Sequence, residues 1–217
     1  MLYCPPQMAF ADKNALQDFI AQHSFGSLVS TPFFCSHLPW LLKRDEGEHG
    51  VLYGHLARQN PHWRQLSQQQ VLITFTGPHA YISPRWYHSE KAVPTWNYAV
   101  AQVLGQAELL DEVTTLAQLA RQIAQYEPDI GEAMTKMPRN YQQQLAAGIV
   151  GVKVTITELS GKLKLGQHRS AADQQGVFAA LYGNPEPEAQ ALAALMQQYQ
   201  LGAGQVAEPV RQNSIQG

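Results

Sequence analysis

The stretch GHLARQNPHW, residues 54–63, carries the side chains best suited to bind an anion. A predicted strand delivers His55 and Arg58 to a turn, and Asn60 followed by Pro61 is typical of the start of a helix. Backbone amides at a helix start, together with a guanidinium, suit a phosphate group. The same residues also fit an ordinary strand-to-helix connection with a solvent-facing arginine, which the local pattern alone favours.

A second candidate is the segment between Gly77 and Gly105, which is rich in rings and polar groups. Its rings belong to His79, Tyr81, Trp86, Tyr87, His88 and Trp96. Long connections inside compact domains are uncommon and are often functional. Rings beside hydroxyls, amides and cationic side chains favour a flat ligand that carries an anionic group. A small satellite core under a surface loop is the alternative interpretation.

The histidines do not show the HxxxH or HxH spacing that places two imidazoles on one metal ion. Cys35 and His37 share one face of a predicted strand, so a thiolate oriented by an imidazole is conceivable, but no orienting third residue accompanies them. A buried structural cysteine is the better interpretation. Paired acid and base carboxylates are also missing. We therefore predict no metal site and no catalytic side chains, and any chemistry would be carried by a bound cofactor.

The elements that must position these residues follow one another as in an antiparallel sheet. Strands are expected at 24–31, 33–42, 51–57, 71–76, 97–110 and 149–165, with turns at 44–50, Gly77-Pro78 and Ser160-Gly161. One helix is expected after a cap at Asp12 or Asn14, with Leu16, Phe19 and Ile20 on one face. Another is expected after a cap at Asp111, with Leu116, Leu119, Ala120 and Ile123 on one face. Further helices are expected near 62–66, at 138–148, and from 170 to 200 with a break at 183–188. This order predicts a mostly antiparallel β-barrel with helical additions, an α+β fold.

Net charge, apolar runs and cysteine spacing argue against several classes of function. The formal net charge is -2 over 217 residues, so the chain lacks the basic footprint of a protein that binds nucleic acid directly. No apolar run approaches the ~20 residues of a membrane helix, and the first ten residues do not resemble a signal peptide. The two cysteines form no CxxC pattern. We therefore expect a reduced, cytoplasmic protein that does not enter a membrane.

Several motifs together resemble the PaiB family of FMN-binding negative transcriptional regulators. They are SFGSLVS, SHLPWLL, GHLARQNPHW, FTGPHAYISPRWY, VPTWNYAVAQVLG, GIVGVKV and KLKLGQHR, in the family's order and spacing. The resemblance runs from Tyr3 to Leu201. It implies a six-stranded split barrel of the pyridoxamine-phosphate-oxidase type that forms a homodimer, with FMN at the subunit interface.

The resemblance also implies which residues hold the flavin. The phosphate would lie near Arg58 and the strand end His55–Ala57, the first strand would approach the ring or ribityl chain, and residues 95–97 would add contacts that could cross the dimer. The full implied set is Ser27, Leu28, Ser30, His37, His55, Ala57, Arg58, Asn60, Trp63, Thr95, Trp96, Asn97, Gln167 and Arg169.

Two segments of the chain depart from the usual pattern of the family. Gly166 and His168 stand where the family usually has Ser and Asn, which removes two polar contacts, and residues 30–39 form a shorter, more apolar segment than usual. We expect a flavin-binding domain over 1–165, C-terminal helices packed on it over 166–201, and a disordered tail over 202–217.

The function implied by the resemblance is transcriptional regulation by a flavin-binding dimer. The charge balance favours action through a regulatory protein partner over direct contact with DNA. Three alternatives stay open: a flavin-dependent oxidoreductase that uses NAD(P)H or a small molecule, a haem-binding split-barrel protein, and a dimeric interaction module that has lost its cofactor. The sequence does not decide whether the protein is an enzyme.

Overall fold

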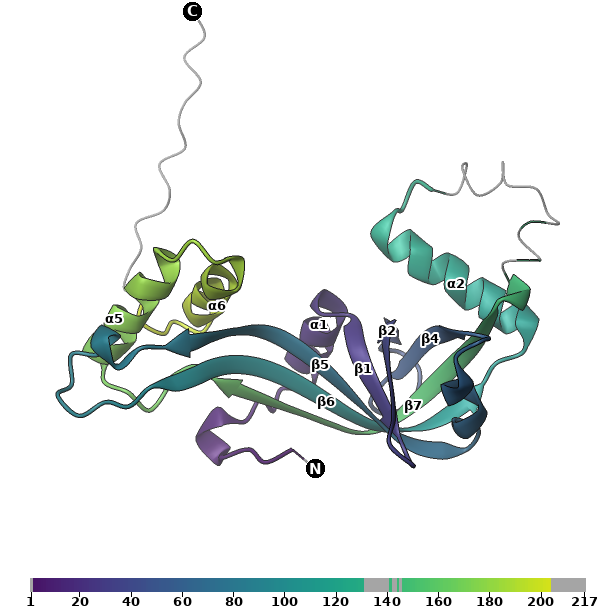
Figure 1. Ribbon diagram of the computed structural model, residues 1–217, viewed down its shortest axis with the longest axis horizontal. Helices are drawn as coiled ribbons and strands as arrows, with labels where there is room; N and C mark the ends of the chain where they lie inside the picture. Colours follow the sequence, from purple (N-terminus) through teal and green to yellow (C-terminus); the bar gives the residue numbers. More distant parts are fainter. Residues whose placement is uncertain (1, 131–140, 142–143, 145, 204–217) are drawn as a thin grey trace, which may run out of the picture. The chain divides into compact units, whose positions relative to one another are not determined.

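A computed structural model describes residues 2–130, 141, 144 and 146–203 of the chain (Figure 1). The strands are β1 Phe25–Ser30, β2 Phe34–Pro39, β3 Leu41–Lys43, β4 Val51–Ala57, β5 Gln69–Ile82, β6 Thr95–Leu109 and β7 Ile149–Lys164. The described helices are α1 Lys13–Gln22, α2 Glu112–Tyr126, α5 Ala171–Tyr182 and α6 Pro187–Gln198, with short 3-10 helices η1 Pro6–Met8, η2 Pro61–Gln65 and η3 Pro84–Trp86.

Within the described residues, seven strands form one antiparallel sheet in the order β2-β1-β5-β6-β7-β4-β3. Some pairs join consecutive strands and others join strands far apart in the sequence. β1 pairs with β2 over its whole length and with β5 through Ser27 and Thr74, and β4 pairs with β7 from Val51 to Ala57. Figure 1 shows β5, β6 and β7 side by side. The predicted antiparallel fold with helical additions is confirmed.

The chain forms two compact units, and β5, β6 and β7 contribute residues to both. The first unit lies within Met1–Gly77 and Ala99–Leu163, and the second within Pro78–Tyr98 and Lys164–Gly217. The first unit has an apolar core that includes Leu28, Leu52, Ile73, Phe75 and Val152, all essentially inaccessible to solvent. In the second unit, Leu181, Leu192 and Met196 are buried where α5 packs on α6.

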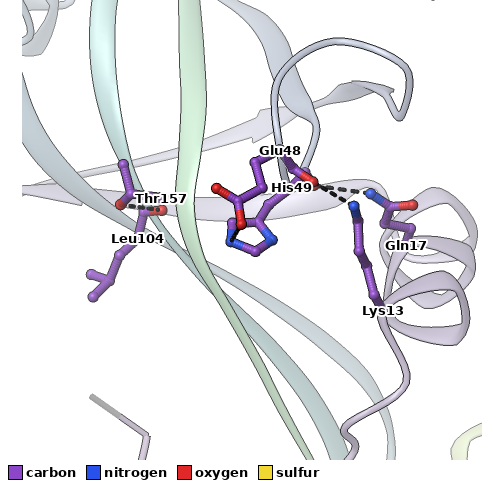
Figure 2. Close-up of polar contacts among 6 residues, drawn as sticks. All are labelled: Lys13, Gln17, Glu48, His49, Leu104 and Thr157. Carbon is purple, nitrogen blue, oxygen red and sulfur yellow. Dashed lines mark hydrogen bonds and ion pairs between the residues drawn. The ribbon is translucent and has the colours of Figure 1, made fainter.

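Helix α1 begins and packs as its sequence predicts. The Asp12 side chain accepts a hydrogen bond from the Ala15 amide at 2.7 Å, which satisfies one of the free amides of the first turn. Leu16, Phe19 and Ile20 are buried, so the predicted apolar face is confirmed. On the polar side, Lys13 and Gln17 donate to the carbonyls of Glu48 and His49 in the turn before β4, which fastens the helix to the sheet (Figure 2).

The two glycine positions that the sequence assigns to turns, Gly77 and Gly161, lie inside continuous strands. A Cβ at Gly77 would lie 2.5 Å from Phe19 Cζ, and a Cβ at Gly161 would lie 2.4 Å from Leu16 Cδ2. Both glycines therefore make room for the apolar face of α1. The prediction of turns there was wrong, because close approach by a distant helix and a chain reversal both favour glycine.

The connection between β5 and β6 is consequently shorter than predicted. Strand β5 continues to Ile82 and β6 already begins at Thr95, so only residues 83–94 connect them. That connection begins with η3, whose cap is the Ser83 hydroxyl accepting from the Arg85 amide at 3.3 Å. Residues 77–82 and 95–96 of the predicted aromatic loop are therefore strand, so His79, Tyr81 and Trp96 project from strands while Trp86, Tyr87 and His88 lie in the connection.

Helix α2 begins as predicted, with Asp111 accepting from the Thr114 amide at 2.8 Å, but it buries a different face. Its buried residues are Thr115 and Gln122, whereas Leu116 is 36% exposed. Thr115 donates to the Asp111 carbonyl at 2.7 Å and Gln122 donates to the Pro39 carbonyl at 2.7 Å. These internal bonds allow the polar side chains to be buried, which a prediction from apolar periodicity cannot anticipate.

Three predicted segments, 33–42, 138–148 and 202–217, differ from the observed elements or lie partly outside the described residues. The predicted strand 33–42 is divided into β2 and β3 at Trp40, whose ring is buried. The predicted helix at 138–148 lies partly outside the described residues, although 141, 144, 146 and 147 are helical. Most of the predicted disordered tail, from 204 onward, also lies outside them.

Candidate functional site

Arg58 lies where β4 ends and the chain turns into η2. Its amide donates to the Gly148 carbonyl at 2.8 Å, and its side chain donates from Nε to the Ala147 carbonyl at 2.7 Å and from Nη2 to the Ile149 carbonyl at 2.9 Å. These two side-chain bonds use two of the five donors of a guanidinium. The group is therefore held at a fixed place and still has donors for an anion.

A cavity of about 200 Å³ opens beside Arg58 in the first unit. Its wall is mostly apolar and combines the end of β6, the beginning of β7 and the start of α2 with the Arg58 turn. The lining residues are Arg58, Trp63, Leu109, Leu110, Glu112, Thr115, Ala146, Ile149 and Val150. The Trp63 indole donates to the Arg58 carbonyl at 2.9 Å, which sets the orientation of that ring. A cationic donor beside an apolar wall can accept a ring system that carries an anionic group.

Behind this connection lies a buried hydrogen-bonded network centred on His62. The His62 ring bonds to Ser30 Oγ at 2.9 Å through Nε2 and to Ser36 Oγ at 2.8 Å through Nδ1. Asn60 donates to Ser36 Oγ at 2.9 Å and accepts from the His62 amide at 3.0 Å. Burial lowers the pKa of His62, so the ring is held neutral with both nitrogens satisfied. The network fixes the shape of the turn that presents Arg58.

The residues predicted on the first strand do not share one face. Ser27 bonds to His37 Nδ1 at 2.9 Å, and the neighbouring Phe25 ring stacks on His37 with centroids 6.5 Å apart. Leu28 and Ser30 are buried, and the Leu28 side chain belongs to the core. Ser27 and His37 thus belong to an exposed patch of β1 and β2, whereas Ser30 belongs to the buried His62 network.

His55 lies three residues before Arg58 but points to a separate place. It is half-buried against α2, and this burial lowers its pKa. A hydrogen bond with Gln122 acts in the opposite direction but is the smaller effect. It lines a very small space with Tyr53 and Gln118. Ala57 is exposed at the end of β4, next to Arg58.

The second unit contains the remaining predicted residues, which lie near the beginning of β6 and after the end of β7. The Lys164 ammonium donates to Thr95 Oγ1 at 2.5 Å and to the Trp96 carbonyl at 2.7 Å. The Gln167 side chain accepts from the Leu165 amide at 2.9 Å, and the Arg169 guanidinium lies over the Tyr87 ring, 4.6 Å from its centroid. Asn97 is 3% exposed and lines the same small space as Tyr87 and Arg169.

The Trp96 ring is separated from this group. Thr95 and Asn97 share one face of β6, and successive side chains of a strand point to opposite faces. Trp96 is 53% exposed and lines a different cavity with His79, Tyr81 and Trp86. Thr95 and Asn97 therefore lie on one face of β6, and the Trp96 ring lies on the other and lines a different cavity.

Three residues that form several of the hydrogen bonds described above, Ser36, His62 and Lys164, were not among the predicted site residues. Ser36 and His62 hold the turn before η2, and Lys164 joins the beginning of β6 to the end of β7. Each lies inside a quoted motif, SHLPWLL, GHLARQNPHW or KLKLGQHR, so the motif rather than the residue type was the available signal. In the part of the chain that the structure describes, no cluster of three or more His, Cys, Asp or Glu could hold a metal ion.

The sheet topology defines a class of protein, the split-barrel flavin-binding fold. A flavocytochrome from Azotobacter vinelandii matches with a TM-score of 0.58 at 18% identity, covering 72% of this chain and 69% of that one. An FAD and heme binding protein from Mycobacterium smegmatis matches with a TM-score of 0.54 at 14% identity, covering 72% and 73%. At these identities the two structures establish the fold alone.

The chain belongs to the family described as "Putative FMN-binding domain", whose model matches residues 2–158. It is 31% identical over 202 residues to "Protease synthase and sporulation protein PAI 2" of Bacillus subtilis, covering 90% of this chain and 97% of the relative. An uncharacterized protein of Emericella nidulans is 30% identical over 224 residues, covering 82% and 89%. The predicted membership of the PaiB family and FMN as its cofactor are confirmed. Among the described helices, none is long and apolar enough to cross a membrane.

Proposed function

We propose that this protein is an FMN-binding regulator of transcription that works as a homodimer, with the flavin phosphate bound by Arg58. The observation that carries the proposal is the fixed guanidinium beside a largely apolar cavity. All the residues that line this cavity lie inside the 2–158 segment that the family model matches.

The residues around Arg58 suit FMN in charge and polarity. The guanidinium has donors left for phosphate oxygens, and Leu109, Leu110 and Val150 offer apolar surface to a flat ring. Bound FMN supplies one- and two-electron redox chemistry at its ring. The chain's own residues bind the phosphate, hold the turn through His62 and exclude water from the apolar wall.

The size of the cavity supports a second protomer at this site. Sites for small molecules and cofactors commonly enclose about 300 to 1,000 Å³. The cavity beside Arg58 holds about 200 Å³, so one protomer supplies only part of the wall that FMN needs. The edge of the sheet at β1 and β2 exposes large rings, with Phe25 67% and Phe33 93% exposed, which suits a contact with a second copy.

The regulatory part of the proposal rests on the resemblance to the PaiB regulators and on the Bacillus subtilis relative, which is named a "Protease synthase and sporulation protein". A net charge of -2 disfavours binding to a phosphate backbone. We therefore propose that a regulatory protein partner, and not direct reading of a DNA groove, transmits the flavin signal. Binding of the FMN-loaded protein to a promoter fragment, with the strong salt dependence of phosphate contacts, would contradict this mode of action.

The flavin site is tested by equilibrium titration with FMN. Because a hydrogen bond to a charged group contributes about 1.5–3 kcal/mol, Arg58→Ala should weaken FMN binding by about 10- to 150-fold. Arg121→Ala, which removes the same charge from the exposed surface of α2, should leave the affinity within about twofold. Quenching of flavin fluorescence measures both. Equal affinity of Arg58→Ala and the wild type would place the phosphate elsewhere.

A further inference from the structure

The second unit holds a cavity that the proposed flavin site does not use. It encloses about 390 Å³ and lies between the end of β5, the beginning of β6 and the start of α6. The side chains that give it its character are His79, Tyr81, Trp86, Trp96, Glu186 and Glu188. Its volume falls within the range of about 300 to 1,000 Å³ that small-molecule sites occupy.

The walls of this cavity are aromatic. The Trp96 ring lies 6.3 Å from the Tyr81 ring in an edge-to-face arrangement and 6.2 Å from the His79 ring. Trp96 is 53% exposed and Tyr81 is 47% exposed, so large ring surfaces face the cavity and the solvent instead of a core. The faces of such rings carry partial negative charge and attract cations.

The charge of the rim has the same sign as the ring faces. Glu186 and Glu188 line the cavity, and none of the described lining residues is a lysine or an arginine. Glu188 lies 3.8 Å from His79 Nδ1, with its side chain 64% exposed. Glu186 occupies the cap position of α6, and its side chain makes no capping hydrogen bond there.

We propose that this cavity binds a small organic cation of the methylated ammonium type. The rings supply a surface that attracts a bulky cation, and the two carboxylates balance its charge. An anion such as a flavin phosphate would meet the opposite preference, which separates this cavity from the Arg58 site in chemistry. The assignment goes beyond the proposed flavin function and does not depend on it.

Isothermal titration of the full chain with choline tests the proposal, with 3,3-dimethyl-1-butanol as a neutral probe of nearly the same shape. We expect saturable binding of choline and at least tenfold weaker binding of the neutral alcohol, because only choline can use the charge of the site. Equal affinity for the two probes, or no saturable binding of choline, would overturn the proposal.

Variants of the rim and the wall locate the site. Glu188→Gln keeps the shape and should weaken choline binding about fivefold, and Trp96→Leu should weaken it about tenfold or more. Glu158→Gln removes the same charge from an exposed position of β7 and should change nothing. Equal effects of the two glutamate variants would contradict the assignment.

The same titration with FMN-saturated protein separates this proposal from the flavin site. An unchanged choline affinity is the expected result. Competitive displacement of choline by FMN would assign the cavity to the flavin site and overturn the proposal. Failure of FMN to bind at all would contradict the proposed function and leave the choline result unaffected.

Discussion

His62 shows how a single residue determines the shape of the proposed flavin site without touching its ligand. Its ring is 1% exposed and bonds to two serine hydroxyls, Ser30 and Ser36, and burial lowers its pKa, which favours the neutral ring in the folded protein. A histidine with an ordinary pKa near 6.5 accepts protons more readily in the unfolded chain. The turn that carries Arg58 therefore depends on a side chain that favours the folded state above that pH.

This dependence predicts a pH effect on stability. The folded pKa of His62 is lowered, so the unfolded state binds more protons as the pH falls below about 6.5, and the free energy of unfolding decreases in the same direction. His55 acts in the same sense, so the contribution of His62 is obtained by comparison with a His62→Gln variant.

His62→Gln should cost about 1–3 kcal/mol at pH 7.5, because it disturbs a buried hydrogen-bonded network. The difference between wild type and variant should become smaller at pH 5.5, since only the wild type loses this titration. Urea unfolding followed by circular dichroism measures both values. A difference that stays constant between the two pH values would contradict the account of a neutral, buried His62.

At the scale of elements, long strands pack so closely that particular glycines have no room for a side chain. A Cβ at Gly105 of β6 would lie 2.5 Å from Val154 Cγ1 and 2.6 Å from the Thr155 carbonyl oxygen on β7. A backbone atom cannot move aside as the end of a side chain can. The distance between these two strands therefore depends on glycine at this position.

Gly105→Ala should accordingly lower the free energy of unfolding by about 1–3 kcal/mol, the usual cost of overpacking. Gly183→Ala is the matched control, because a Cβ there would meet only the Ala179 carbonyl at 3.4 Å. It should change stability by less than about 1 kcal/mol. Thermal unfolding of the two variants decides the point, and equal losses would show that the close approach of β6 and β7 is not the cause.

Local patterns predicted the elements well wherever the determining contacts were local. Asp12 and Asp111 cap helices through amides three residues away, and the predicted bounds of β4, 51–57, match the observed ones. Contacts between distant segments were not predictable in this way. Gly77 and Gly161 accommodate α1, and α2 buries Gln122 in place of the expected Leu116, with Gln122 donating a hydrogen bond to the Pro39 carbonyl.

The candidate site was predictable to a similar extent. The motifs indicated the Arg58 turn and the Thr95–Asn97 strand, whose contacts with FMN stay predictions, whereas membership of the FMN-binding family is confirmed. The motifs gave no information about which side chains share a face. The fixed guanidinium, the buried His62 and the separation of Trp96 from Thr95 depend on pairing and packing that no single stretch of sequence specifies.

At the scale of the whole molecule, the proposed flavin site requires two copies of the chain. Phe25 on β1 is 67% exposed, so its replacement by aspartate should leave the protomer folded while placing a charge in the proposed interface. We expect Phe25→Asp to sediment as a monomer and to bind FMN more than tenfold more weakly, with Arg58 still present. Tyr182→Asp, at a residue that is 70% exposed on α5, serves as the control and should remain dimeric. A dimeric Phe25→Asp variant would place the interface elsewhere, and a monomeric wild type would remove the dimer from the account.

The most direct test of the central claim is a crystal structure of the FMN-loaded protein. We expect the flavin phosphate within hydrogen-bonding distance of the Arg58 guanidinium, and the ring against the wall that includes Trp63 and Val150. The ring should also contact the second protomer of a dimer. A phosphate bound away from Arg58, or a flavin enclosed by a single protomer, would contradict the account.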